Sequence, residues 1–162
     1  MDKKYKVIIS LTLALIILIV LPLIIFLKGN STVFKITIHP TGTLSNSYYF
    51  VLKQNRVLYC SVGDRQNNDI GTNEFLEVTV KHAKKKLTKQ DYQQLINLVN
   101  QIGEYGNDYK VKEPLGYFFV SLYYDNEVYE TSYFLVTNMR LINLINRIID
   151  ISPVDVDLNI FA

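Results

Sequence analysis

Carboxylates gather in the second half of the chain, where a pair of them could carry out acid–base chemistry. The residues concerned are Glu104, Asp108, Glu113, Asp125, Glu127 and Glu130. Hydrolysis of a glycosidic bond needs two acids that flank a cleft. Closeness in sequence does not build a cleft, so we expect these side chains to be solvated surface charges. A hydrolase of cell-wall polymer that uses carboxylates of this region stays open as the alternative function.

A loop rich in oxygen ligands, residues 64–74, has the composition of a calcium site. The calcium-chelating loop of helix–loop–helix proteins has glycine at its sixth position and glutamate at its twelfth. Counted from Asp64, these positions hold Asp69 and Phe75. The spacing fails, and we expect a solvated loop that binds no metal.

Other signatures of catalysis are missing from the sequence. The glycines are scattered and form no phosphate-binding loop, and no serine has the flanking glycines of a nucleophile elbow. His39 and His82 have no metal-ligand partner at helical or hairpin spacing, and Cys60 lies in an apolar stretch typical of a buried thiol. We therefore expect no enzymatic activity, no catalytic residue, no metal and no cofactor.

Lysines form the strongest charge cluster of the chain. They are Lys81, Lys84, Lys85, Lys86 and Lys89. An edge strand that is protected from aggregation by its charges explains them. The functional interpretation is contact with anionic lipid head groups or with an anionic wall polymer. Lys84, Lys85 and Lys86 are therefore candidate binding residues.

Tyrosine is unusually abundant, with twelve residues and no tryptophan. In a strand that begins near residue 116, Tyr117 and Tyr123 would project opposite to Phe118 and Leu122. One of these two faces can be core, and the other must be covered by the same chain or by a partner. Tyrosine is enriched at protein interfaces. We therefore take Tyr117, Tyr123 and Tyr124 as candidate binding residues for a protein or envelope-polymer partner.

The first half of the domain that carries these residues has the pattern of strands. Alternating or β-branched and aromatic residues predict strands over Val33–His39, Ser47–Lys53, Arg56–Val62 and Phe75–His82. Only Gln54-Asn55 separates the second and third strands, which indicates a hairpin.

Helical spacing begins after Thr88, which with Asp91 resembles a capping box, and Gly103 is expected to stop this helix. A second hairpin, a second helix and a last short strand follow. Their expected positions are Gly116–Tyr124 and Glu127–Val136 about Asp125-Asn126, a helix capped by Thr137 or Asn138, and a tail strand over Val154–Ile160. The order ββββαββα, with the tail strand added, predicts an α+β domain: one antiparallel sheet with two amphipathic helices packed on it.

Before this domain, residues 7–27 are apolar and uncharged, long enough to cross a membrane as one helix. Three lysines precede this span and only Lys28 follows it, which predicts a cytoplasmic N-terminus. We expect a basic tail over residues 1–6, a signal anchor over 7–27, a linker over 28–32 and an extracytoplasmic domain over 33–162. A cleaved signal peptide is the alternative.

Charge and composition limit the choice of partner. The net charge of the whole chain is +2. Four lysines and one aspartate before residue 33 contribute +3, so the domain that follows has a net charge of only −1. This nearly neutral domain gives no electrostatic argument for binding nucleic acid. Abundant isoleucine, lysine, asparagine and tyrosine, with one cysteine, suggest a bacterial envelope protein. The sequence predicts a non-catalytic, membrane-anchored binding module. An immunity protein that captures a toxin at the membrane is a further alternative, and the sequence does not specify an oligomeric state.

Overall fold

The structure is a computed structural model, and it describes residues 15–20, 22–23, 29–40, 46–65, 76–105, 118–132 and 139–158. The chain divides into two compact units, Met1–Ser31 and Thr32–Ala162. In the first unit, residues 15–20 and 22–23 are helical. Across the described ranges, no helix combines the length and the apolar character that crossing a membrane requires. The remainder of the predicted anchor, residues 7–14, 21 and 24–27, lies outside the described residues.

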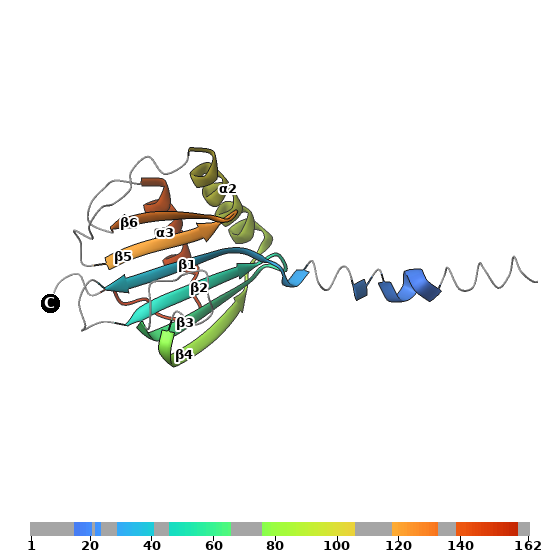
Figure 1. The fold of residues 1–162 in the computed structure, drawn as a ribbon, viewed down its shortest axis with the longest axis horizontal. Helices are drawn as coiled ribbons and strands as arrows, with labels where there is room; N and C mark the ends of the chain where they lie inside the picture. Colours follow the sequence, from blue (N-terminus) through green and yellow to red (C-terminus); the bar gives the residue numbers. More distant parts are fainter. Residues whose placement is uncertain are drawn as a thin grey trace, which may run out of the picture. The chain divides into compact units, whose positions relative to one another are not determined.

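The described residues of the second unit form six strands and two helices in the predicted order. The elements are β1 (Thr32–Pro40), β2 (Ser47–Lys53), β3 (Val57–Arg65), β4 (Leu76–Lys86), α2 (Lys89–Tyr105), β5 (Phe118–Tyr124), β6 (Glu127–Ser132) and α3 (Met139–Ile151). The strands form one sheet in the order β4-β3-β2-β1-β5-β6, and every described neighbouring pair is antiparallel (Figure 1). The predicted α+β class is therefore confirmed.

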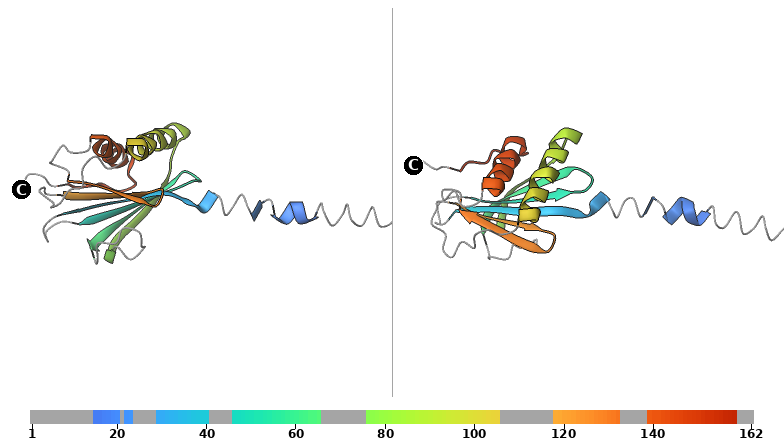
Figure 2. Two further views of the ribbon diagram at one scale, coloured as in Figure 1. Left: turned by 45° about the horizontal axis from the view of Figure 1, so that its top comes forward. Right: turned by 90° about the horizontal axis from the view of Figure 1, so that it is seen from above.

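Both helices lie on the same face of the sheet, as Figure 2 shows from two directions. The hydrophobic core fills the space between the two helices and the sheet. Alternate residues of the strands enter it, among them Phe34, Ile36, Phe50 and Leu122, all at most 1% exposed. Within the described residues, every buried hydrophobic side chain belongs to the segment from Phe34 to Val154. The unit Thr32–Ala162 thus has a hydrophobic core of its own, as an independently folding domain requires.

The turns of the two hairpins show how local sequence sets the register. Asp125 and Asn126 both have positive φ, 51° and 64°, which is the backbone of the type I′ turn expected between β5 and β6. Between β2 and β3 the turn also includes Arg56, whose φ is 68° and whose N–H donates to the carbonyl of Lys53. The side-chain oxygen of Asn55 accepts a hydrogen bond from the Val57 N–H at 3.1 Å and completes this turn.

The prediction that Gly103 stops the first helix is wrong, because α2 continues to Tyr105. The glycine instead permits a close approach. A Cβ atom on residue 103 would lie 3.1 Å from the Cε1 atom of Tyr124. The missing side chain lets β5 bring its last tyrosine against the helix.

The predicted tail strand is also wrong for its described part, since residues 154–158 form no strand. The hydroxyl of Tyr48 donates to the carbonyl oxygen of Asp157 at 3.3 Å and accepts from its N–H at 3.0 Å. Tyr48 thus satisfies the backbone N–H and carbonyl groups of Asp157, which in a strand would bond to a neighbouring strand. Alternation in the tail places Val154 in the core without sheet pairing. Residues 159–160 lie outside the described residues.

Candidate binding surface

The sheet face opposite the helices carries a continuous row of side chains across all six strands. Consecutive members are register partners: Lys84 with Tyr59, Tyr59 with Val51, Val51 with Lys35, Lys35 with Tyr123, and Tyr123 with Val128. We call these six residues the cross-strand row. Every one of them is partly or fully exposed. With neighbouring strands about 4.8 Å apart, the row is roughly 24 Å long.

Contacts within the sheet hold the aromatic members of the row in place. The Nζ atom of Lys35 lies over the ring of Tyr123, 5.8 Å from its centroid, and the Tyr123 hydroxyl donates to Oδ1 of Asn126 at 3.1 Å. The ring of Tyr59 stacks on His82 with a centroid distance of 6.1 Å. His82 is in turn hydrogen-bonded through Nδ1 to the Ser61 hydroxyl, 2.8 Å away. Both tyrosines are therefore oriented before any partner binds.

The next row along the strands is buried at its middle, where it supports the cross-strand row. It includes Thr37 and Ser121, which are 0% and 3% exposed, and Tyr49, which is 6% exposed. Tyr49 packs against Val51 and Tyr123 of the cross-strand row. Burial raises the pKa of the Tyr49 hydroxyl to about 12, so this support stays uncharged at neutral pH.

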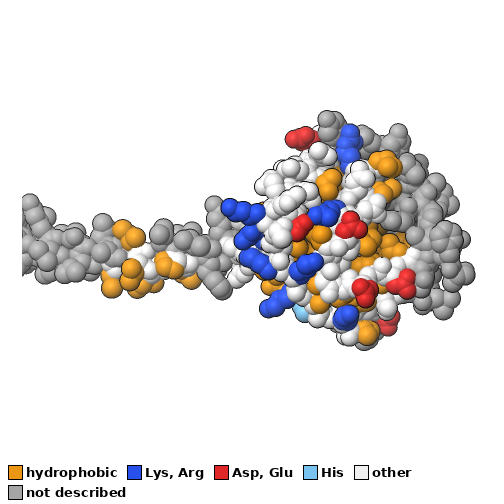
Figure 3. All heavy atoms as spheres, turned by 180° about the vertical axis from the view of Figure 1, so that it is seen from behind, with side chains coloured by type: hydrophobic (Ala, Val, Ile, Leu, Met, Phe, Trp, Pro, Cys, Tyr) orange, Lys and Arg blue, Asp and Glu red, His pale blue; other side chains and the backbone are white. Residues whose placement is uncertain are grey.

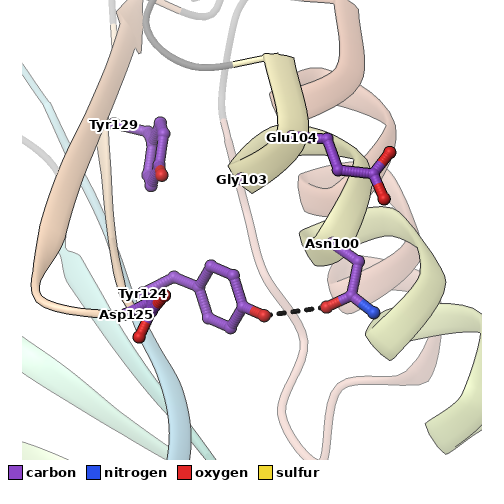
Figure 4. A pocket seen from close by; sticks show the side chains of 6 residues that line it. All are labelled: Asn100, Gly103, Glu104, Tyr124, Asp125 and Tyr129. Atoms are coloured by element: carbon purple, nitrogen blue, oxygen red, sulfur yellow. Dashed lines mark hydrogen bonds between the residues drawn. The ribbon is translucent and has the colours of Figure 1, made fainter.

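A hollow of about 320 Å³ lies on the helix side, between α2 and the β5–β6 hairpin. Its lining residues are Asn100, Gly103, Glu104, Tyr124, Asp125 and Tyr129 (Figure 4). The Tyr124 hydroxyl donates to Oδ1 of Asn100 at 2.8 Å and ties the hairpin to the helix. Burial, assisted by the nearby carboxylate of Glu127, raises the pKa of Tyr129.

Two of the predicted carboxylates, Glu104 and Asp125, line this hollow, but they do not converge. Figure 4 shows the Glu104 carboxylate directed away from the tyrosines, with Asn100 and Tyr124 between it and Asp125. Glu130 lies elsewhere, on β6, and accepts a hydrogen bond from the Ser121 hydroxyl at 3.3 Å. Asp108 and Glu113 fall outside the described residues.

The predicted metal loop is largely untested, because residues 66–75 lie outside the described residues. Asp64, at the edge of this loop, is exposed on β3. In the described ranges, no group of three or more histidine, cysteine or acidic side chains could hold a metal ion.

The candidate tyrosines do not share one surface. Tyr123 belongs to the cross-strand row, whereas Tyr124 points toward α2 and packs against the core. Tyr117 lies outside the described residues.

The candidate lysines alternate between the two faces in the same way. Lys84 is a row member and Lys86 follows it on the same face, while Nζ of Lys85 donates to the carbonyl of Ile151 at the end of α3, 3.2 Å away. Tyr123 and Lys84 thus share one row although 39 positions separate them in the sequence.

Sequence reasoning missed the members in the middle of the row: Val51, Tyr59 and Lys35. Their strands were predicted, and the alternation of each strand already places them opposite the core. What the sequence lacks is the strand order, which alone brings the three side chains side by side.

The protein is an α+β domain whose sheet is covered by two helices on one face and carries the cross-strand row on the other. Comparison with known proteins assigns no family, since no family model and no curated protein matches the chain.

Proposed function

We propose that this chain is a non-catalytic, membrane-anchored binding module whose cross-strand row contacts a protein partner. The observation that carries the proposal is the row itself, with Tyr59, Val51, Tyr123 and Val128 accessible on one face. Ordered tyrosines offer a large contact area at a low cost in side-chain entropy. The row spans the width of the sheet, which suits a folded surface or a long segment of a partner.

The location of the module is part of the proposal. The apolar run of residues 7–27 serves as the anchor, and the lysines before it keep the N-terminus in the cytoplasm. The domain then stands outside the cell membrane, in the envelope. There the row is free to bind a protein, and an envelope polymer is the alternative partner.

Site-specific photo-crosslinking in cells tests the role of the row. A photoreactive amino acid at Tyr59 or Val128 is expected to give a defined protein adduct. The matched control places the same probe at Asn97 on α2 or at Asn143 on α3, both exposed on the helix side. These positions are expected to give no adduct of that mass.

Loss of the ring should remove the interaction that the crosslink reports. With the probe at Val128, the variant Tyr59→Ala is expected to lower the adduct yield at least several-fold, since the probe itself is unchanged. Equal adducts from the two faces, or none from either, would contradict the proposal. An adduct that contains polysaccharide instead of protein would identify the alternative partner.

A further inference from the structure

Basic side chains collect at one end of the domain, the end at which β1 begins. The antiparallel register brings the start of β1, the β2–β3 turn, the end of β4 and the start of α2 to this end. We call the following residues the basic end: Lys53, Arg56, Lys84, Lys85, Lys86 and Lys89. Figure 3 shows lysine and arginine side chains grouped at one end of the domain.

The contacts of the basic end place it beside the start of the domain. Nζ of Lys53 donates to the Oγ1 atom of Thr32, the first residue of β1, at 2.8 Å. Nζ of Lys86 donates to the carbonyl of Asn55 in the neighbouring turn. Lys84, Lys86 and Lys89 are exposed. In the described part of the chain, none of the six cations forms a salt bridge with a carboxylate.

Acidic residues at the same end lie on the other side of the sheet. Asp125 lies in the β5–β6 turn and Glu127 begins β6, at the opposite edge of the sheet from β4. The lysines of the basic end belong to β2, to β4 and to the start of α2. Asp91, near the start of α2, is paired with Arg147, and the charge of Lys85 also acts on its carboxylate. Although its net charge is nearly zero, the domain is therefore asymmetric in charge. The basic end surrounds the β2–β3 turn, which lies next to Thr32.

The sequence fixes how far this end can be from the predicted anchor. Only residues 28–31 separate Leu27 from Thr32. The five extended steps from Leu27 to Thr32 span at most about 18 Å. Gly29 and Asn30 are helical, which shortens the connection further. With the anchor in a bilayer, the start of β1 lies within the thickness of the head-group region and its counterion layer.

We propose that the basic end docks on anionic phospholipid head groups of the membrane that holds the anchor. This inference rests on the proposed anchor but not on the proposed protein partner. Charge complementarity and the short connection favour lipid over a wall polymer. Lys84 belongs to both surfaces, so docking at this end would engage one end of the cross-strand row. The other five members of the row are not part of the basic end.

Binding of the domain to pure lipid vesicles tests the inference. Because residues 32–162 have a hydrophobic core of their own, they can be prepared without the anchor. In low salt, this domain is expected to float with vesicles of phosphatidylcholine that contain 30% phosphatidylglycerol, and not with phosphatidylcholine alone. The double variant Arg56→Gln/Lys89→Gln should weaken partitioning about 25-fold, at about five-fold for each cation near the surface.

A control variant with the same net charge separates a site from general attraction. Lys81→Gln/Arg140→Gln removes two cations that lie outside the basic end, one earlier in β4 and one in the first turn of α3. This variant should change partitioning less than two-fold. Both variants need melting temperatures near that of the unaltered domain, and raised salt should abolish binding of the unaltered domain.

Several results would overturn the inference. Equal losses in the two double variants would show general attraction only, and equal binding to neutral and anionic vesicles would show that charge is not used. Binding to purified polyglycerol phosphate but not to vesicles would assign the basic end to a wall polymer. Because Arg56 and Lys89 lie outside the cross-strand row, the photo-crosslink from Val128 reports the protein partner independently of this result.

Discussion

Cys60 and Tyr49 are buried ionisable residues on opposite faces of the same sheet. Cys60 is 0% exposed in the core, as the apolar stretch around it predicts. Burial raises the pKa of its thiol from 9.0 to about 12. Burial likewise raises the pKa of Tyr49 from 10.0 to about 12. In the folded protein, both side chains therefore stay protonated up to a higher pH than they do in the unfolded chain.

The raised pKa values predict a loss of stability in alkali. Above pH 9 the thiol of the unfolded chain ionises while the folded one does not, so protons leave on unfolding and stability falls as pH rises. The thiol alone should lower the free energy of unfolding by about 1 kcal/mol between pH 8 and pH 10. Urea titrations at the two pH values measure this change. Cys60→Ala should show a smaller change, and equal changes in both proteins would contradict the assignment.

The close approach of Tyr124 to Gly103 predicts that substitutions at these two residues change the free energy of unfolding non-additively. Alanine within a helix is favoured over glycine by up to about 1 kcal/mol. In Gly103→Ala, the new Cβ atom, 3.1 Å from the tyrosine ring, should consume part of that gain. In a Tyr124→Ala background the same substitution should recover the full gain. A double-mutant cycle of urea unfolding measures the difference, and an identical effect in both backgrounds would show that the ring exerts no steric limit.

Among the elements, α2 has its N-terminus fixed by a cap that is also tied to α3. The Asp91 N–H donates to Oγ1 of Thr88 at 3.0 Å, and the Thr88 hydroxyl donates to Oδ2 of Asp91 at 2.7 Å. Arg147 of α3 pairs with the other carboxylate oxygen. The hydroxyl of Thr88, followed by the Arg147 charge, lowers the pKa of Asp91. One capping residue thus orients both helices over the sheet.

Removal of the capping hydroxyl should destabilise the domain. Thr88→Ala is expected to lower the free energy of unfolding by about 1 kcal/mol, the usual cost of a lost N-cap. Thr88→Ser keeps the hydroxyl and should stay close to the unaltered protein. Chemical denaturation of the three proteins at neutral pH gives the comparison. Equal losses for serine and alanine would mean that packing of the methyl group, and not the cap, stabilises the helix.

Elements that depend on local signals could be predicted, and those that depend on distant contacts could not. The hairpin at Asp125-Asn126 and the helix after Thr88 follow from residues a few positions apart. The tail alternates like a strand, yet Tyr48, more than 100 positions earlier, bonds to the backbone of Asp157 and competes with pairing. Glycine is typical of the end of a helix, but at residue 103 its role is to leave room for the ring of Tyr124 on β5.

At the scale of the whole molecule, the strand order creates the candidate site. β1 lies between β2 and β5, and its pairing with β5 joins residues that are 78 to 90 positions apart, which no local pattern predicts. Without this pairing of β1 with β5, Tyr123 and Lys84 are two candidate binding residues on separate hairpins, and nothing indicates that they share a surface. The two faces of each strand could be predicted by alternation, whereas the row that joins them could not.

The division of the chain predicts the behaviour of a truncated protein. Residues 32–162 should melt within about 2 °C of the full chain in detergent, since all of the buried hydrophobic side chains among the described residues belong to the second unit. The full chain should resist alkaline extraction from membranes, while the truncated one should be recovered in solution. Scanning calorimetry and membrane fractionation test the two parts. A large loss of melting temperature would show that the first unit packs on the domain.

The central position of β1 has a mechanical consequence. A pull that is transmitted through residue 31 enters the sheet along the axis of β1, which is bonded to β2 on one side and β5 on the other. Antiparallel ladder bonds lie perpendicular to the strands, so such a load shears two ladders at once and does not open them one bond at a time. A load applied at this point would therefore meet its greatest resistance at β1, the strand that receives it.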